Sequence, residues 1–189
     1  VSISGSGNVA QFACEKVLDL GGKPVTFSDS SGFIHDPEGI DRAKLAFVMD
    51  LKNNRRGRIS EYAKQYPSAT FTASAPEPSV NGLWNVDVDV ALPCATQNEL
   101  NGEEAKMLVA NKVIAVGEGA NMPCTPEAVE VFHEAGVLFA PGKASNAGGV
   151  ATSGLEMSQN SLRLSWTREE VDKRLEDIMV DIHKNAFET

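Results

Sequence analysis

The sequence lacks an excess of positive charge and any long apolar run. Its 189 residues include 17 Lys and Arg against 26 Asp and Glu, for a formal net charge of −9. A surface with this balance repels phosphate backbones and anionic lipid headgroups. No apolar run approaches the ~18 residues that a membrane-spanning helix requires. We therefore expect neither nucleic acid nor a membrane as a partner.

Cysteine and histidine are also scarce and scattered. Cys14, Cys94 and Cys124 lie far apart, with no Cys-x-x-Cys or Cys/His spacing. We therefore predict neither a disulfide framework nor a structural zinc site, and no metal centre. Reduced thiols in or near the core are typical of a cytoplasmic protein, which is the location that we expect.

What is present is typical of a folded domain. Hydrophobic residues make up 42% of the chain and charged residues 23%, which is ordinary globular usage. A length of 189 residues suits one large domain, or one domain with an appendage. The chain opens at Val1, inside an apolar run with the character of a strand. We therefore expect it to be a piece of a longer protein.

Short apolar segments alternate with segments of helical spacing along the first 140 residues. Strands are predicted at residues 1–4, 24–28, 86–92, 112–116 and 137–140. Helices are predicted at residues 9–20, 43–51, 60–66, 103–110 and 125–135, the last with Thr125 as N-cap, and loops at residues 33–39 and 73–82. This alternation predicts an α/β, Rossmann-like, doubly wound and mostly parallel sheet with helices on both faces.

The last quarter of the chain has a different pattern, because no strand is predicted after Pro141. A Gly-rich loop leads into a helix that ends near Leu164, and a final helix begins at a capping box of Thr167 and Glu170. Its apolar stripe consists of Val171, Leu175, Ile178, Met179, Ile182 and Ala186. The stripe is expected to bury against the sheet or against a domain outside this chain.

Residues 5–10 read Gly-Ser-Gly-Asn-Val-Ala, directly after a predicted strand and at the start of a helix. In this pattern Gly5 makes a tight turn, Gly7 lets the backbone approach a pyrophosphate, and Ala10 lets the helix pack on the strand. The free N–H groups at the helix N-terminus then hold the phosphates. The motif predicts a dinucleotide site, and its alternative is a tight turn without phosphate.

The residues that would select the cofactor give conflicting signals. Asp29 ends the second strand, where an acidic residue accepts from the ribose 2′-hydroxyl and favours NAD. Hydroxyls and cations suited to the 2′-phosphate of NADP follow nearby: Ser30, Ser31, Lys52, Arg55, Arg56 and Arg58. The alternative function of this basic run is to offset the dipole at a helix C-terminus. These residues alone leave both cofactors open.

Three later loops follow predicted strands, at residues 93–98, 117–123 and 143–150. The carboxyl ends of parallel strands form the edge where open α/β sheets bind ligands, so amides and glycines recurring there suggest a lining for nicotinamide and ribose. Each loop taken alone is also explained by turn chemistry. Cys94 and Cys124 have no adjacent base in the sequence and are interpreted as packing residues.

Five of these segments together resemble the cofactor-binding domain of hexameric glutamate dehydrogenases, over essentially the whole chain. They are residues 5–10, 92–98, 119–123, 147–150 and 153–160. The resemblance implies a parent enzyme, a homohexamer, that interconverts glutamate with 2-oxoglutarate and ammonium. Hydride would pass between the substrate α-carbon and C4 of the nicotinamide.

The resemblance also implies roles for individual residues. Ser6, Asn8 and Val9 would contact the pyrophosphate, Ala95, Thr96 and Gln97 would flank the nicotinamide, and Asn121 would hold its ribose or amide. Asn146, Val150 and Ser153 would bind the substrate. Ser153 would donate to the distal carboxylate, which favours glutamate because a buried donor disfavours substrates that lack the partner. With the residues above, the expected cofactor set is Gly5, Ser6, Gly7, Asn8, Val9, Asp29, Ser30, Lys52, Arg55, Ala95, Thr96, Gln97 and Asn121.

The segment at residues 28–32, with Lys52 and Arg55, resembles the NADP-preferring branch, so NADP is expected and NAD is the alternative. The family's catalytic Lys and Asp are expected in a substrate domain outside this chain, towards which residues 147–189 would lead back. The chain is therefore expected to bind cofactor without turnover. The open alternatives are a leucine, valine or phenylalanine dehydrogenase, and a non-catalytic dinucleotide-binding module. A Rossmann-like methyltransferase fits less well, because residues 5–10 suit a pyrophosphate.

Overall fold

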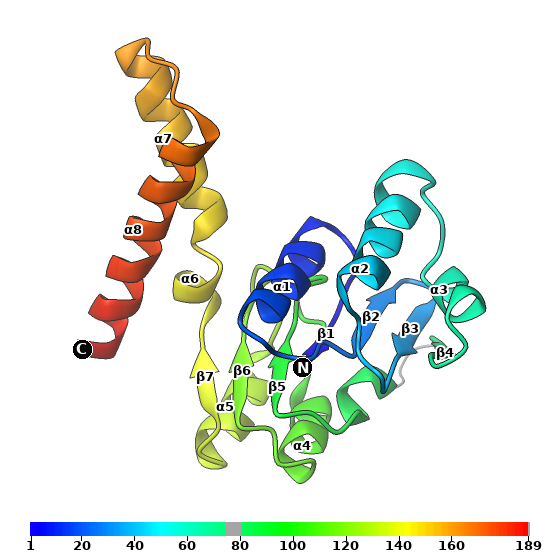
Figure 1. The fold of residues 1–189 in the computed structure, drawn as a ribbon. Helices are drawn as coiled ribbons and strands as arrows, with labels where there is room; N and C mark the ends of the chain where they lie inside the picture. Colours follow the sequence, from blue (N-terminus) through cyan, green and yellow to red (C-terminus); the bar gives the residue numbers. More distant parts are fainter. Residues whose placement is uncertain (75–80, 189) are drawn as a thin grey trace. The chain divides into compact units, whose positions relative to one another are not determined.

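Seven short strands form two hydrogen-bonded sheets in the computed structural model, which describes residues 1–74 and 81–188 (Figure 1). The first sheet is parallel, in the order β1 (Ser2–Ile3), β5 (Val90–Leu92), β6 (Ala115–Gly117) and β7 (Leu138–Ala140). The second is antiparallel, in the order β2 (Thr26–Asp29), β3 (Gly32–His35) and β4 (Thr70–Ala73).

The two sheets meet where β2 runs parallel beside β1. The Val25 N–H donates to the Val1 carbonyl at 2.9 Å, and the Ser28 N–H donates to the Gly5 carbonyl at 2.9 Å. Between them the Thr26 hydroxyl accepts from the Ile3 N–H at 2.8 Å. β2 thus lies on one side of β1, and β5, which comes later in the chain, lies on the other side of β1. Such a reversal of strand order is the switch point at which doubly wound sheets bind ligands.

The predicted loop at residues 33–39 is wrong in its first part, because residues 33–35 belong to β3. A two-residue turn at Ser30 and Ser31 joins β2 to β3, and β4 then pairs with β3. β4 has no buried residue. The sequence of β4 therefore lacks the apolar pattern that predicts a strand, and β4 forms because it pairs with β3. Ala73, assigned to the loop at residues 73–82, ends β4, and residues 75–80 of that loop lie outside the described residues.

Helices cover both faces of the parallel sheet, as predicted. They are α1 (Asn8–Asp19), α2 (Arg42–Met49), α3 (Ser60–Gln65), α4 (Gly102–Ala110) and α5 (Pro126–Glu134). α2 continues into a π-helical segment, η1 (Asp50–Asn54), and a 3₁₀ turn, η2 (Gly82–Asn85), precedes β5. The predicted start of α5 is confirmed, because the Thr125 hydroxyl accepts from the Ala128 N–H with Pro126 at the first helical position.

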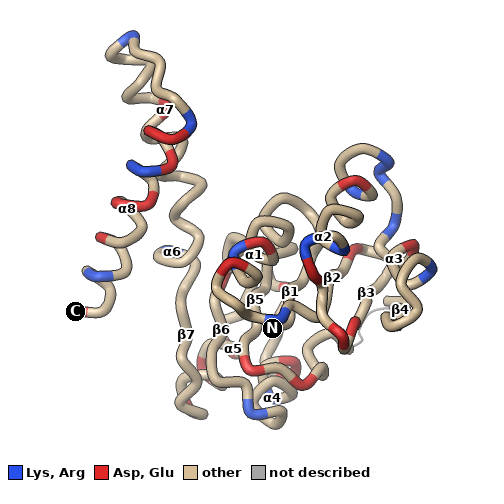
Figure 2. The backbone as a smooth tube through the Cα atoms, in the orientation of Figure 1, with Lys and Arg blue, Asp and Glu red and all other residues tan. Residues whose placement is uncertain are grey.

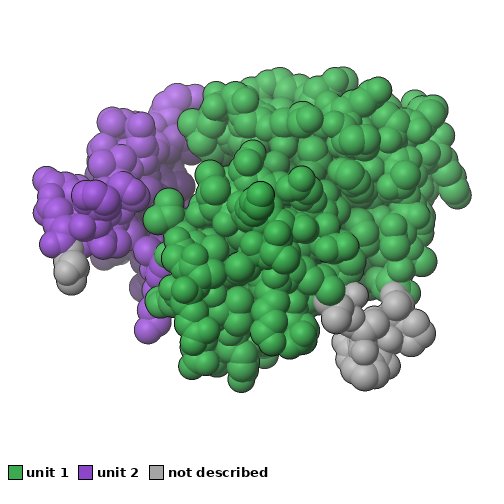
Figure 3. All heavy atoms as spheres, turned by 90° about the horizontal axis from the view of Figure 1, so that it is seen from below, with its two compact units in different colours: residues 1–140 green, residues 141–189 purple. Residues whose placement is uncertain are grey.

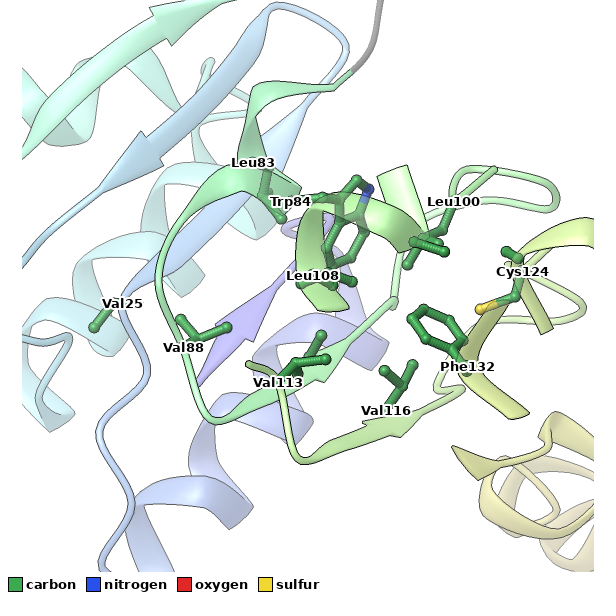
Figure 4. Packing of buried hydrophobic residues seen from close by; sticks show 13 residues of the cluster. Val25, Leu83, Trp84, Val88, Leu100, Leu108, Val113, Val116, Cys124 and Phe132 are labelled. Atoms are coloured by element: carbon green, nitrogen blue, oxygen red, sulfur yellow. The ribbon is translucent and has the colours of Figure 1, made fainter. Parts of the chain in front are cut away.

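Two hydrophobic cores lie on the two faces of the sheet. Ala91 belongs to one core and its neighbour Leu92 packs against the other, as the two-residue period of a strand requires. The first core includes Trp84, Leu108 and Phe132, from η2, α4 and α5 (Figure 4). The second is built from α1, α2 and α3. The cores hold the sheet so that the carboxyl ends of its strands remain at one edge.

A buried carboxylate connects η2 to α4. Glu104 is 3% exposed and accepts from the Asn81 N–H at 2.6 Å and from the Asn101 N–H at 2.8 Å. The Asn101 side chain accepts in return from the Glu104 N–H at 3.1 Å, which completes a capping box. Glu104 therefore supports a helix start and a neighbouring turn at once.

Replacing Glu104 by alanine is expected to lower the free energy of unfolding by about 2–4 kcal/mol, because two backbone donors lose their acceptor. Urea denaturation followed by circular dichroism measures the change. Glu103→Ala is the matched control, since the Glu103 side chain is exposed and forms a solvent-exposed ion pair with Lys106. That variant should remain close to the unmodified chain, and equal losses for both would contradict the assignment.

The chain divides into two compact units, Val1–Ala140 and Pro141–Thr189 (Figure 3). The second unit contains α6 (Gly142–Ser145), α7 (Gly148–Leu162) and α8 (Arg168–Glu188). The predicted capping box is confirmed: the Thr167 N–H donates to Glu170 at 2.7 Å, and the Glu170 N–H donates to the Thr167 hydroxyl at 3.2 Å.

α7 and α8 pack side by side as a helical hairpin within the second unit (Figure 1). Five members of the predicted stripe on α8 are half-buried, and the sixth, Ala186, is exposed. Neither helix has a fully buried residue. In the described part of the chain, no helix combines the length and apolarity needed to cross a membrane.

Candidate functional site

The loop of residues 5–9, here called the glycine loop, joins the end of β1 to the start of α1. Gly5 has φ +78°, and a Cβ at this position would lie 3.0 Å from the Cys94 carbonyl oxygen. Gly7 is the N-cap of α1, and the first turn of this helix contains no acidic side chain. Because the N–H groups of a first turn have no intrahelical acceptor, this end of α1 suits an anion.

The end of β2 is hydrogen-bonded directly to the glycine loop. The Gly5 N–H donates to the Ser28 hydroxyl at 2.7 Å, while the Ser28 N–H donates to the Gly5 carbonyl at 2.9 Å. This reciprocal pair places Asp29, the next residue, beside the glycine loop.

The Asp29 carboxylate accepts four hydrogen bonds. One oxygen accepts from the Ser31 N–H at 2.9 Å and from the Ser31 hydroxyl at 2.5 Å. The other accepts from the Lys52 ammonium at 3.0 Å and from the Ile59 N–H at 2.8 Å. A carboxylate has about four lone-pair directions, so these donors fill them. Burial alone would raise the pKa of Asp29, but the bonds from Ser31, Ile59 and Lys52 hold it at about 2.

The low pKa predicts acid-sensitive stability. The Asp29 pKa falls from 3.8 to about 2 on folding, so its ionised form stabilises the fold above pH ~4. That contribution, about 2 kcal/mol, is lost as the pH falls from ~4 to ~2. Unfolding free energies of the unmodified chain and of Asp29→Asn should therefore converge over this range. A difference that stays constant with pH would contradict the low pKa.

Two cations of the basic run reach this turn. Arg58 donates to the Ser30 hydroxyl at 2.6 Å, and Lys52 donates to Asp29 and to the Gly57 carbonyl at 2.9 Å. Figure 2 shows the basic segment between α2 and α3. Arg58 belongs to the predicted run but not to the predicted cofactor set. The sequence carries no signal that separates it from its neighbours.

Arg55, which is in the predicted set, points to other partners in this structure. Its guanidinium donates to Asp50 at 2.8 Å and to Glu61 at 3.5 Å. It also lies 5.0 Å from the centre of the Phe47 ring. The structure thus brings Lys52 and Arg58, rather than Arg55, to the turn of Asp29 and Ser30.

An amide pair that the sequence analysis missed ties the glycine loop to η1. Gln11 is 2% exposed and donates to the Ser6 carbonyl at 2.8 Å. Its side chain also exchanges two 3.1 Å hydrogen bonds with Asn53. The available signal was a polar residue on the buried face of α1, between Ala10 and Cys14. The pair keeps the basic segment at a set distance from the glycine loop.

On the other side of the glycine loop, residues 93–98 and 117–123 are joined by backbone hydrogen bonds. The N–H groups of Gly119 and Ala120 both donate to the Pro93 carbonyl at 3.0 Å. A Cβ on Gly119 would lie 2.5 Å from the Cys94 sulfur and 3.3 Å from the Val9 side chain. The predicted residues of these loops, Ala95, Thr96, Gln97 and Asn121, are exposed. The close contacts of Gly119 with Val9, and of Gly5 with residues 94 and 95, place both loops at the same sheet edge as the glycine loop.

Glu99 organises the first of these loops and was also missed. One of its carboxylate oxygens accepts from the Ala95 N–H at 2.8 Å and from the Thr96 N–H at 3.3 Å. The Ser4 hydroxyl also hydrogen-bonds to this carboxylate. Nothing in the sequence separates Glu99 from an ordinary polar loop residue.

The cysteines are buried free thiols. Burial raises the pKa of Cys14 and of Cys94 to about 12, so both stay protonated near neutral pH. These thiols pack rather than act as nucleophiles. Among residues 1–74 and 81–188, no group of three or more His, Cys, Asp and Glu side chains is placed to hold a metal ion.

The predicted substrate residues belong to the second unit. Asn146 is the C-cap of α6, while Val150 and Ser153 lie one turn apart on α7. Val150 is 72% exposed, and the Ser153 hydroxyl donates to the Gly149 carbonyl at 3.4 Å. Both side chains are thus presented on an open helix face.

Comparison with known proteins agrees with this architecture. A family model described as Glutamate/Leucine/Phenylalanine/Valine dehydrogenase matches residues 1–189. An NAD(P)-specific glutamate dehydrogenase of Xylanibacter ruminicola is 61% identical over 186 residues, which cover 98% of this chain and 40% of the relative. The NADP-specific glutamate dehydrogenase of Escherichia coli (strain K12) is 54% identical over 188 residues, which cover 100% and 40%.

A solved structure of Plasmodium falciparum glutamate dehydrogenase superimposes with a TM-score of 0.87 at 45% identity, covering 96% of this chain and 38% of that one. The chain therefore spans about 40% of the length of the curated relatives that it matches. Because the family model covers all of its residues and its fold is that of these enzymes, the chain belongs to the Glutamate/Leucine/Phenylalanine/Valine dehydrogenase family.

Proposed function

We propose that this chain is the NADP-binding domain of a glutamate dehydrogenase. The parent enzyme would interconvert L-glutamate with 2-oxoglutarate and ammonium, and the bound NADP would supply the hydride acceptor or donor at C4 of its nicotinamide. The observation that carries the proposal is the glycine loop at the switch point of the sheet, with the helix N-terminus open to a pyrophosphate.

The preference for NADP over NAD rests on Asp29. Its carboxylate already accepts four hydrogen bonds, so it has no lone pair directed at a ribose 2′-hydroxyl. Beside it, the Ser30 hydroxyl and the Arg58 guanidinium are suited to a 2′-phosphate. Asp29 thus positions Lys52 and does not exclude the 2′-phosphate of NADP from this turn.

The remaining residues are assigned from the similarity of this chain to glutamate dehydrogenases. The backbone of Ser6, Asn8 and Val9 would hold the pyrophosphate, and Ala95, Thr96, Gln97 and Asn121 would hold the nicotinamide half. Asn146, Val150 and Ser153 would contact the substrate, with the Ser153 hydroxyl donating to the distal carboxylate of glutamate. Groups that move protons on the substrate are proposed to lie outside this chain.

The cofactor assignment is tested by titrating the chain with NADPH and NADH while nicotinamide fluorescence is followed. NADPH should bind more tightly. Arg58→Ala should weaken NADPH selectively, by about 1–3 kcal/mol, because it removes a charge-assisted contact. Arg55→Ala is the matched comparison and should have a smaller effect, since Arg55 is paired with Asp50 and Glu61.

Equal affinity for NADPH and NADH would contradict the NADP assignment. A larger loss of NADPH affinity in Arg55→Ala than in Arg58→Ala would contradict the assignment of Arg58 to the 2′-phosphate.

For the reaction itself, the parent protein should reduce NADP with glutamate and not with leucine, while this chain alone should show no turnover. Oxidation of leucine by the parent would place it with the other branches of the family.

The parent is also proposed to be a cytoplasmic homohexamer, and light scattering of the parent in solution tests the assembly. The location is supported by three unpaired thiols, which are typical of a reducing compartment.

A further inference from the structure

We propose that Glu99 is a positioning residue for the nicotinamide half of the cofactor: it sets the backbone of residues 94–96 and places a negative charge that favours the oxidised ring over the reduced one. This inference rests on the proposed function.

The contacts of Glu99 orient three consecutive backbone N–H groups. The N–H groups of Ala95 and Thr96 donate to one carboxylate oxygen of Glu99. The Cys94 N–H donates to the Ser4 hydroxyl at 2.8 Å, and this hydroxyl hydrogen-bonds to Glu99. Residues 95 and 96 are exposed although their N–H groups are all engaged. The Glu99 carboxylate thus fixes the backbone of the exposed residues 95 and 96.

The position of this loop assigns it to the nicotinamide half. Asp29 and Ser30 lie beyond the end of β2, on the side that takes the adenosine ribose in a doubly wound sheet. The glycine loop at the end of β1 takes the pyrophosphate, so the other half of a dinucleotide must lie beyond β5 and β6. The glycine loop touches residue 95 there, since a Cβ on Gly5 would lie 3.1 Å from the Ala95 Cα.

The charge of Glu99 matters because the nicotinamide ring carries a positive charge when oxidised and none when reduced. The other titratable groups near Glu99 are Glu104, Cys94 and Cys124, with Glu118 bonded to the Cys124 N–H. Burial raises the pKa values of both thiols, so they remain neutral, whereas the other two neighbours, Glu104 and Glu118, are carboxylates. The local field is therefore negative, which stabilises a cationic ring relative to a neutral one.

Two substitutions in the 189-residue chain separate position from charge. Glu99→Gln keeps an oxygen that accepts from Ala95 and Thr96 but removes the charge, whereas Glu99→Ala removes both. Dissociation constants for NADPH and NADP⁺ are measured by fluorescence and calorimetry at pH 8. Glu99→Gln should leave the NADPH constant close to that of the unmodified chain and weaken NADP⁺ by roughly 3- to 10-fold. Glu99→Ala should weaken both. Glu103→Gln, on the exposed side of α4, should change neither.

The outcomes separate this inference from the proposed function. If the unmodified chain binds neither dinucleotide, the proposed function fails. If it binds both but Glu99→Gln leaves the ratio of the NADP⁺ and NADPH affinities unchanged, the electrostatic role of Glu99 is overturned. If Glu99→Ala also binds both dinucleotides normally, the positioning role of Glu99 is overturned as well.

If Glu99→Ala does not fold, the pH dependence of cofactor binding tests the proposal. Burial raises the pKa of Glu99. In the unmodified chain, the affinity for NADP⁺ relative to that for NADPH should therefore decline on mild acidification, because Glu99 becomes protonated. In Glu99→Gln this relative affinity should not change with pH. Identical pH profiles for the two proteins would overturn the proposal.

Discussion

Replacing Asp29 by alanine is expected to lower the free energy of unfolding by about 3–5 kcal/mol, because it breaks a largely buried ion pair and removes the acceptor of four hydrogen bonds. Four hydrogen bonds are lost, from the Ser31 N–H and hydroxyl, the Lys52 ammonium and the Ile59 N–H, while Lys52 still donates to the Gly57 carbonyl. The side chains of Asp29 and Lys52 are 9% and 19% exposed, so water replaces these bonds poorly.

The measurement is urea denaturation at pH 7, with Asp50→Ala as control. Asp50 also pairs with a cation, Arg55, but its side chain is 52% exposed. The control should be nearly as stable as the unmodified chain, because solvent-exposed ion pairs contribute little. Equal stability losses in the two variants would show that Asp29 is not the centre of a buried network.

Replacing Gly5 by alanine is expected to weaken NADPH binding by roughly tenfold or more, equivalent to about 1.4 kcal/mol. The backbone of Gly5 lies in the left-handed region, and an added Cβ would lie 3.0–3.2 Å from Cys94 and Ala95. The glycine loop would have to move away from residues 94–95, which disturbs both the pyrophosphate and the nicotinamide sides of the site. Stability should also fall by about 1–2 kcal/mol from the left-handed conformation.

Gly136→Ala separates the two effects. Gly136 also has a left-handed φ of +69°, but a Cβ there would meet no atom within 4 Å in the described structure. Gly136→Ala should lose about the same 1–2 kcal/mol of stability that the left-handed conformation costs in Gly5→Ala, and it should bind NADPH normally. NADPH titration and thermal unfolding of both variants check the prediction. Normal binding by Gly5→Ala would remove the glycine loop from the site.

The elements that the sequence predicted well depend on neighbours three or four residues apart. The caps at Thr125 and Thr167 and the glycine loop opening α1 are of this kind. The alternation of strands and helices also specified the α/β class, because each segment needs a helix or strand opposite it to bury its apolar face. β4 escaped prediction because its exposed side chains carry no such pattern.

The sequence by itself therefore determined the fold class, the glycine loop and the chemical types available at one sheet edge. Only the tertiary structure decided which partners meet. Lys52 and Ile59 reach Asp29 across 23 and 30 residues. Arg58 rather than Arg55 meets Ser30, because η1 and the turn after it direct cations of one run to different sides. Such pairings arise from the path of the backbone between distant segments, which local spacing does not encode.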